Sequence, residues 1–132
     1  MTQRLVEYLN NMSTEEREYI IAEIPYLFAH LNYTEKFSKL LSDYDFICLK
    51  ISLYGTNFLI PDYDLMDLHN LDLNHDVKQS LKIIQSAIIL AENVLSKDKK
   101  QLASQLWGRL SPEQSHIIKK LLYAAKERST CS

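Results

Sequence analysis

Side chains that commonly carry out catalysis or bind metal ions are few and scattered in this sequence of 132 residues. Its two cysteines, Cys48 and Cys131, are too few for a disulfide framework or a four-cysteine metal site. A cysteine–histidine nucleophile pair could form only by tertiary proximity, which nothing in the sequence indicates. The histidines are spread along the chain, at His30, His69, His75 and His116. We therefore predict no catalytic residue and no enzymatic activity.

A run of aspartates has the approximate look of a calcium loop: Asp62, Asp64, Asp67 and Asp72. No glycine stands at the sharp turn of such a loop and no glutamate closes it, so the match is poor. The chain has only two glycines, Gly55 and Gly108, which excludes a glycine-rich loop that would cradle a phosphate. We predict no metal ion and no cofactor.

Charge is distributed unevenly along the chain, although the total is only −2. Residues 43–77 carry a net charge of −6 and residues 78–132 a net charge of +6. This pattern indicates internal pairing, solvated helix faces or two different partner surfaces. Nucleic-acid binding is disfavoured by the near-neutral total and by the lack of a recognition-helix motif. The candidate partner-binding residues are Lys97, Lys99, Lys100, Arg109, Lys119 and Lys120.

A long amphipathic helix over residues 74–98 is the element around which the chain is expected to fold. It has two neighbouring apolar stripes at helical spacing, so it needs packing partners on two sides. Asn74 is a good N-cap, and lysines follow the other end. The first stripe consists of Val77, Leu81, Ile84, Ile88, Ala91 and Leu95, and the second of Ile83, Ala87, Leu90 and Val94.

Cap residues, prolines and glycines divide the rest of the chain into shorter helices. We expect an opening helix over residues 5–12 and a capping box between Ser13 and Glu16. Pro25 should kink the next helix or break it near Ile24, and Pro61 should limit a short helix over residues 57–63. A polar loop is expected over residues 64–73. Further helix starts are predicted at Thr34, Asp43 or Asp45, Asp98 and Ser111, with a helix end at Gly55.

These elements predict an all-α fold in which about six or seven helices form a superhelical stack of hairpins, as one domain over residues 1–132. No apolar run reaches the ~20 residues needed to cross a bilayer, and no secretory signal is present, so a cytoplasmic location is expected. The eight tyrosines and Trp107 suit either a protein interface or the packing between helices. A homodimer is possible if one stripe of the long helix has no internal neighbour.

Several short segments, taken in order, resemble one known family. That family is the helical domain that follows the NTPase and winged-helix parts of signal-transduction ATPases of the apoptotic protease-activating factor type. The sequence departs from the family at Pro61, where a helix usually continues with alanine, and at Ser104, where glycine is common. The matching segments are Pro25-Tyr26, His30-Leu31, Asp43-Tyr44-Asp45-Phe46, Leu49-Lys50, Gly55-Thr56-Asn57, Leu59-Ile60, Asp62-Tyr63-Asp64, Gln101-Leu102-Ala103, Gln105-Leu106 and Gly108-Arg109-Leu110.

The resemblance implies a scaffold that connects a nucleotide switch to a WD-repeat propeller through helix–helix contacts. The sequence contains neither a Walker motif nor a propeller, so an excised arm or a stand-alone relative is expected. Its partner is then an ATPase or propeller module, in cis or in trans. The alternative is an unrelated stand-alone interaction or regulatory protein, antitoxin-like or phage-encoded.

Overall fold

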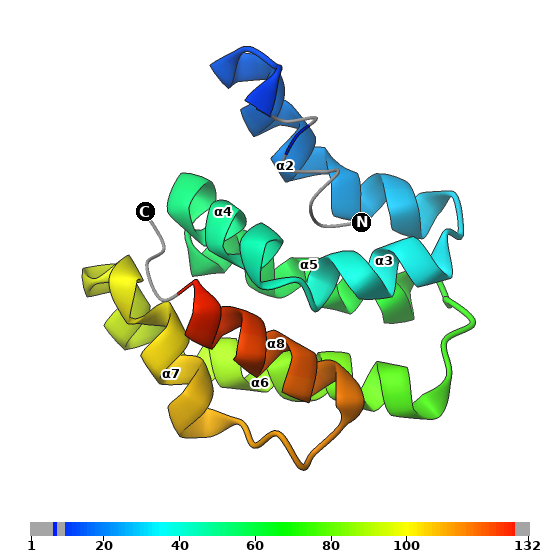
Figure 1. Ribbon diagram of the computed structural model, residues 1–132. Helices are drawn as coiled ribbons and strands as arrows, with labels where there is room; N and C mark the ends of the chain where they lie inside the picture. The colour runs from blue at the N-terminus through cyan, green and yellow to red at the C-terminus, as the bar shows by residue number, and fades with distance from the viewer. Residues whose placement is uncertain (1–6, 8–9, 129–132) are drawn as a thin grey trace.

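The computed structural model describes residue 7 and residues 10–128, which are built almost entirely from helices and their connections (Figure 1). Seven α-helices and one 3-10 helix, η1, occur in this part of the chain, without a strand. Half of the expected opening helix, residues 5, 6, 8 and 9, lies outside the described residues. The bounds are α2 Thr14–His30, α3 Thr34–Leu41, α4 Tyr44–Tyr54, α5 Thr56–Leu68, α6 His75–Lys97, η1 Lys99–Gln101, α7 Leu102–Arg109 and α8 His116–Glu127.

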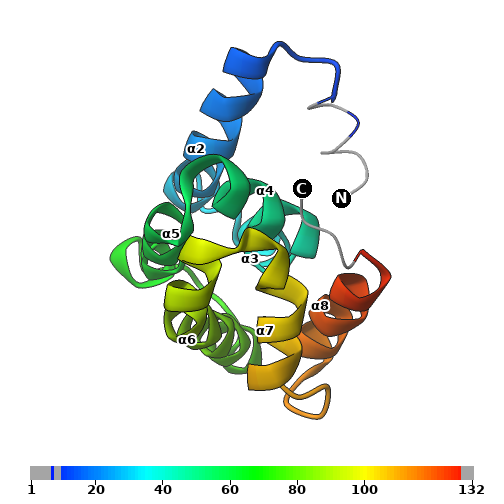
Figure 2. The ribbon, with the colours of Figure 1, turned by 90° about the vertical axis from the view of Figure 1, so that its left-hand side faces the viewer.

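Consecutive helices pack as hairpins, and the hairpins stack on one another. α2 contacts α3, α4 contacts α5, and α7 contacts α8, while α5 against α6 joins the two halves of the chain. Figure 2 shows α2–α5 on one side of the stack and α6–α8 on the other. Every α-helix from α2 to α8 contributes buried apolar side chains to one continuous core. The predicted all-α stack of six or seven helices is confirmed.

α6 is the longest helix of the described chain, and its first apolar stripe is buried as predicted. It contacts α5 from the first half of the chain and η1, α7 and α8 from the second. Five residues of that stripe are buried and Val77 is half-buried. In the second stripe Ala87 is buried, but Ile83 and Val94 are only half-buried and Leu90 is 64% exposed. The prediction of a second covered stripe is wrong at Leu90, because the neighbours of α6 do not enclose its whole circumference.

Four of the predicted caps are present. Ser13 Oγ accepts a hydrogen bond from the backbone N–H of Glu16, at 3.2 Å, and the Ser13 hydroxyl donates to the Glu16 carboxylate at 2.9 Å. Asp43, Asn74 and Asp98 each accept from the backbone N–H two residues further on. Such caps satisfy donors that the first turn of a helix leaves without partners.

Two predicted helix starts are wrong in position. α3 includes Thr34, and Tyr33 precedes it without a side-chain cap. α8 begins at His116 and is capped by Ser115, whose Oγ accepts from the Ile118 N–H at 3.1 Å. The expected start at Ser111 closes into a separate turn instead: the Ser111 N–H donates to the Gln114 side chain at 2.8 Å, and the Gln114 N–H donates to the Ser111 carbonyl at 3.0 Å. The hydrogen bonds between Ser111 and Gln114 therefore form, but no helix begins at Ser111.

Neither internal proline ends a helix. α2 runs through Pro25, so a break into two helices near Ile24 is wrong. α5 runs through Pro61 to Leu68, so the predicted polar loop is wrong over residues 64–68. A proline inside a helix costs about 3 kcal/mol. In α5 that cost is opposed by the burial of Leu59, Tyr63 and Met66 on one face of the helix.

Gly55 alone joins α4 to α5, with φ +88° and ψ 170°. This backbone conformation is strained for every residue except glycine. We expect Gly55→Ala to lower the free energy of unfolding by about 1–2 kcal/mol, although no atom lies within 4 Å of the added Cβ. Urea unfolding followed by circular dichroism measures this loss. Gly108→Ala is the matched control, because Gly108 is helical with equal space around it and should gain about 0.5–1 kcal/mol.

Candidate functional site

A buried ion pair joins α4 to α5 inside the core. The Lys50 side chain is 3% exposed and that of Asp62 is 12% exposed, and Lys50 Nζ lies 3.0 Å from Asp62 Oδ2. The contact is electrostatic, since this carboxylate oxygen makes no hydrogen bond of good geometry. Two charges removed from water need further polar neighbours to be stable, because their mutual attraction rarely offsets the lost hydration.

The Lys50 ammonium finds those neighbours in α2. Nζ donates to the carbonyl oxygens of Ile21 and Ala22, both at 3.2 Å. Pro25 has no N–H, so the Ile21 carbonyl, four residues earlier, lacks its usual donor within the helix. Lys50 supplies that donor from α4. We refer to Lys50, Asp62 and the Ile21 and Ala22 carbonyls as the Lys50 anchor, which ties α2, α4 and α5 together.

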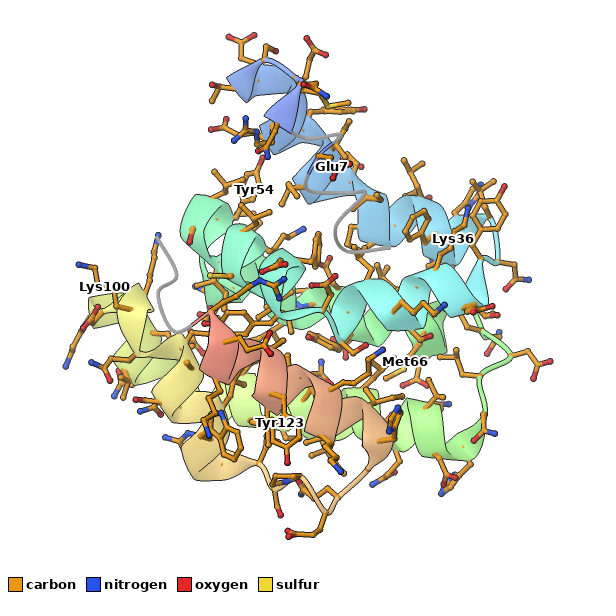
Figure 3. The ribbon with its side chains drawn as sticks, viewed as in Figure 1. Glu7, Lys36, Tyr54, Met66, Lys100 and Tyr123 are labelled. Atoms are coloured by element: carbon orange, nitrogen blue, oxygen red, sulfur yellow. The ribbon has the colours of Figure 1, made fainter. Side chains whose placement is uncertain are left out.

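A second polar contact ties α2 to α4 beside the Lys50 anchor. The Tyr54 hydroxyl donates to the Glu18 carbonyl at 2.6 Å (Figure 3 labels Tyr54, at the end of α4 near α2). The Lys50 ammonium lies 5.8 Å from the centre of the Tyr54 ring. The first helix of the described stack is therefore held by directional bonds as well as by apolar packing.

Burial raises the pKa of Asp62 to about 6, and Lys50 opposes that rise. Desolvation disfavours the charged carboxylate more than the nearby ammonium favours it. Sequence reasoning missed this pair. The signal that it could have used is a single lysine inside the apolar run of residues 46–53.

The six basic residues predicted to bind a partner lie at separate places. Lys97, Lys99 and Lys100 lie at the corner between α6 and η1, where Figure 3 shows Lys100 pointing outward. Arg109 ends α7, while Lys119 and Lys120 lie on α8. The Lys99 ammonium donates to the Ser52 carbonyl at 2.9 Å, and Arg109 donates to the Gln105 side chain at 3.0 Å. These contacts connect the residues to their own surroundings and do not assemble them into one patch.

Internal ion pairs account for part of the uneven charge distribution. Asp67 pairs with Lys78 at 2.9 Å and with Lys82 at 3.5 Å, and Asp45 pairs with Arg128 at 3.4 Å. These contacts join the acidic middle of the chain to its basic end. None of the six predicted partner-binding residues takes part in the ion pairs of the described chain.

One face of α2 leaves large apolar side chains in solvent. Tyr19 is 68% exposed, Leu27 is 47% exposed and Tyr26 is 45% exposed. The Tyr26 ring stacks on His30 and meets His69, after the end of α5, edge-on, both with centroids 5.6 Å apart. We call Tyr19, Tyr26, Leu27 and His30 the α2 face. Tyr44 and Tyr63 are buried in the core, so inter-helix packing is confirmed for some tyrosines, while an interface role for the exposed ones stays a prediction.

The described residues form neither a metal-binding cluster nor a membrane-spanning helix. They contain no group of three or more histidine, cysteine, aspartate or glutamate side chains placed to hold a metal ion. His30 and His69 lie close, with ring centroids 6.2 Å apart, but at the surface rather than in a cleft. None of the described helices has both the length and the apolar character needed to cross a membrane.

A closed helical stack with a continuous core and an exposed aromatic face is a helical packing domain. Residues 2–128 match the family model of the APAF-1 helical domain. The chain belongs to this family, which is a non-catalytic helical region of APAF-1-like signalling proteins. No curated protein and no solved structure matches the chain.

Proposed function

We propose that this chain is a non-enzymatic scaffold, one helical domain that works in the cytoplasm as the arm between a nucleotide switch and a WD-repeat sensor. The observation that carries the proposal is the family match over residues 2–128, nearly the whole chain. The arm acts through contacts with an ATPase or propeller module, in cis or in trans.

An arm that relays a change of position must move as one body, and the Lys50 anchor supports this requirement. The anchor fixes α2 to both α4 and α5 through the ammonium of one buried lysine. A displacement applied to α2 then reaches the rest of the stack without hinging at Pro25. Packed helices with fixed contacts transmit such shifts because their interiors are dense.

The α2 face is the proposed contact with the ATPase module, which precedes the helical domain in the family that the sequence resembles. Exposed tyrosines and leucines favour protein interfaces, since they bury a large area with few rotatable bonds. The six basic residues are proposed as a further contact region, reaching the partner from α6, η1, α7 and α8. None of the six takes part in the ion pairs of the described chain, so none of their charges is neutralised there by a carboxylate within the chain.

Loss of the α2 face is expected to weaken binding. In calorimetric titrations with a purified switch ATPase of the apoptotic protease-activating factor type, Tyr19→Ala/Leu27→Ala should bind about tenfold or more weakly, because it removes two exposed anchors. The matched control is Ile89→Ala/Leu90→Ala, which removes two side chains that are 47% and 64% exposed on α6. The control should bind like the wild type.

Equal weakening by both variants would contradict the assignment of the α2 face. Absence of binding to both the ATPase and a propeller module, together with catalytic turnover, would contradict the scaffold function itself. Repeating the titration at higher salt tests the basic residues, because their contribution should fall with screening.

A further inference from the structure

Cys48 lies on α4, half-buried against the core, and it is disulfide-bonded. Cys131 is the only other cysteine of the chain and lies outside the described residues. The function proposed above uses neither of these two residues. The continuous core of the stack makes a disulfide unnecessary for folding, so the bond calls for another explanation.

The described end of α8 lies beside the part of α4 that carries Cys48. α8 contacts α4, and Arg128 Nε, just after α8, lies 3.4 Å from Asp45 Oδ1. Asp45 and Cys48 are three residues apart within α4, so they lie on the same face of that helix. Cys131 follows Arg128 by three residues, which span at most about 11 Å. This length is enough for Cys131 to reach Cys48, one helical turn along α4 from Asp45.

Noncovalent contacts hold the end of α8 only weakly to α4. The last three residues of the described chain, 126–128, are all exposed. Arg128 is 53% exposed in its ion pair with Asp45, and water and salt screen such a pair. A groove of about 470 Å³ also lies between α8 and the helices α3 and α4, and Arg128 is among its lining residues. A covalent bond at this place would therefore change how firmly α8 is fixed.

We propose that Cys48 and Cys131 form a redox-sensitive clasp that fastens the end of α8 to α4. A small disulfide such as oxidised glutathione is the oxidant. One cysteine thiolate attacks a sulfur of oxidised glutathione and releases one reduced glutathione. The second thiolate then attacks the cysteine sulfur of this mixed disulfide and releases the other. The two protein thiols thus lose two protons and two electrons, which oxidised glutathione takes up as two thiols.

The reversibility of this bond makes the clasp a switch. In a reducing cytoplasm both side chains are thiols, and the end of α8 is held by noncovalent contacts alone. Oxidation closes a loop of about 80 residues and links α4, in the first half of the stack, to the end of α8, in the second. Bonds that close long loops give large stabilisation. This inference goes beyond the scaffold function and does not rest on it.

The test compares the full chain treated with oxidised glutathione and the full chain treated with dithiothreitol. Trypsin digestion without reduction, followed by mass spectrometry, should show residues 40–50 joined to residues 129–132, which contain Cys48 and Cys131. The oxidised chain should stay monomeric, with a Tm about 5–15 °C above that of the reduced chain. Amide hydrogen exchange in the last turn of α8 should slow about tenfold on oxidation.

Cys131→Ser is the matched variant, because it removes the bond and leaves Cys48 in place against the core. Its Tm and its hydrogen exchange should equal those of the reduced wild type and should not respond to oxidation. A disulfide between two copies of the chain, glutathione adducts on separate cysteines, or a linked pair with unchanged Tm and exchange would each overturn the proposal. The scaffold function would survive any of these results, since its own test uses the α2 face.

Discussion

Replacing Lys50 by methionine is expected to lower the free energy of unfolding by about 3–5 kcal/mol, because it removes one partner of a buried ion pair. Asp62 would be left buried without its counter-charge, and the Ile21 and Ala22 carbonyls would lose their donor from α4. Methionine keeps most of the volume and the apolar stem of lysine, so the loss of stability measures the contribution of the ammonium group. Urea unfolding at neutral pH, followed by circular dichroism, measures it.

Two further variants separate the parts of the Lys50 anchor. Lys50→Met/Asp62→Leu removes both charges and should recover part of the loss, because no uncompensated charge then stays in the core. Pro25→Ala restores an N–H that can bond the Ile21 carbonyl within α2. Lys50→Met should therefore cost about 1–2 kcal/mol less in the Pro25→Ala background than in the wild type. Such a coupling is not expected from apolar packing.

Lys36→Met is the matched control for this cycle, because Lys36 is an exposed lysine on α3. Its stability should stay within about 0.5 kcal/mol of the wild type. If Lys50→Met behaved like Lys36→Met, the buried ammonium would have no structural role. If the losses simply added in the Pro25→Ala background, the link between Pro25 and Lys50 would be wrong.

Helix positions were predictable wherever apolar spacing and a capping residue agreed. The first stripe of α6 and the caps Ser13, Asp43, Asn74 and Asp98 are examples of this agreement. At Ser111 the capping groups are present, but the apolar face of α8 begins only at Ile118, so the turn stays separate from the helix. Local capping chemistry therefore marks a helix start only when the buried face follows it directly.

The prolines show why local rules fail inside a packed stack. Pro25 and Pro61 should each oppose a helix, yet α2 and α5 pass through them. In α2 the Ile21 carbonyl, which Pro25 leaves without a donor, is satisfied by Lys50, twenty-nine residues further along the chain. No window of local sequence contains that contact. The compensation is tertiary, so it could be predicted only once the neighbours of α2 were known.

The positions of the predicted partner-binding residues also depend on tertiary structure. The six basic residues were chosen because they are close in sequence, whereas the fold spreads them over four elements. Lys120 instead lines one groove together with Lys39 from α3 and Arg128, which follows the end of α8. Closeness in sequence along α6–α8 does not by itself define a surface, so contact of all six residues with one partner stays a prediction.

The stability of the fold is also expected to depend on pH through Asp62. Burial raises its pKa to about 6 in the folded state, from an ordinary value of 3.8. Between these two values the folded state holds a proton that the unfolded state has lost, so this group stabilises the fold fully below about pH 4. That contribution is lost as pH rises through about 6, and it amounts to about 3 kcal/mol.

Asp62→Asn removes this titration while keeping the size and a polar group. The free energy of unfolding of the wild type, minus that of Asp62→Asn, should fall by about 2–2.5 kcal/mol between pH 4 and pH 7. Hydrogen bonds to Lys39 and Lys78 lower the pKa values of Glu35 and Asp67, so these two groups make stability change with pH in the opposite direction. Their contributions are the same in both proteins and cancel in the difference. Urea titrations at several pH values measure the difference. If the difference stays constant or rises with pH, the pKa of Asp62 is not raised in the folded state. Lys50 would then outweigh burial at this site, and the Lys50 anchor would hold α2 most tightly with the Asp62 carboxylate charged.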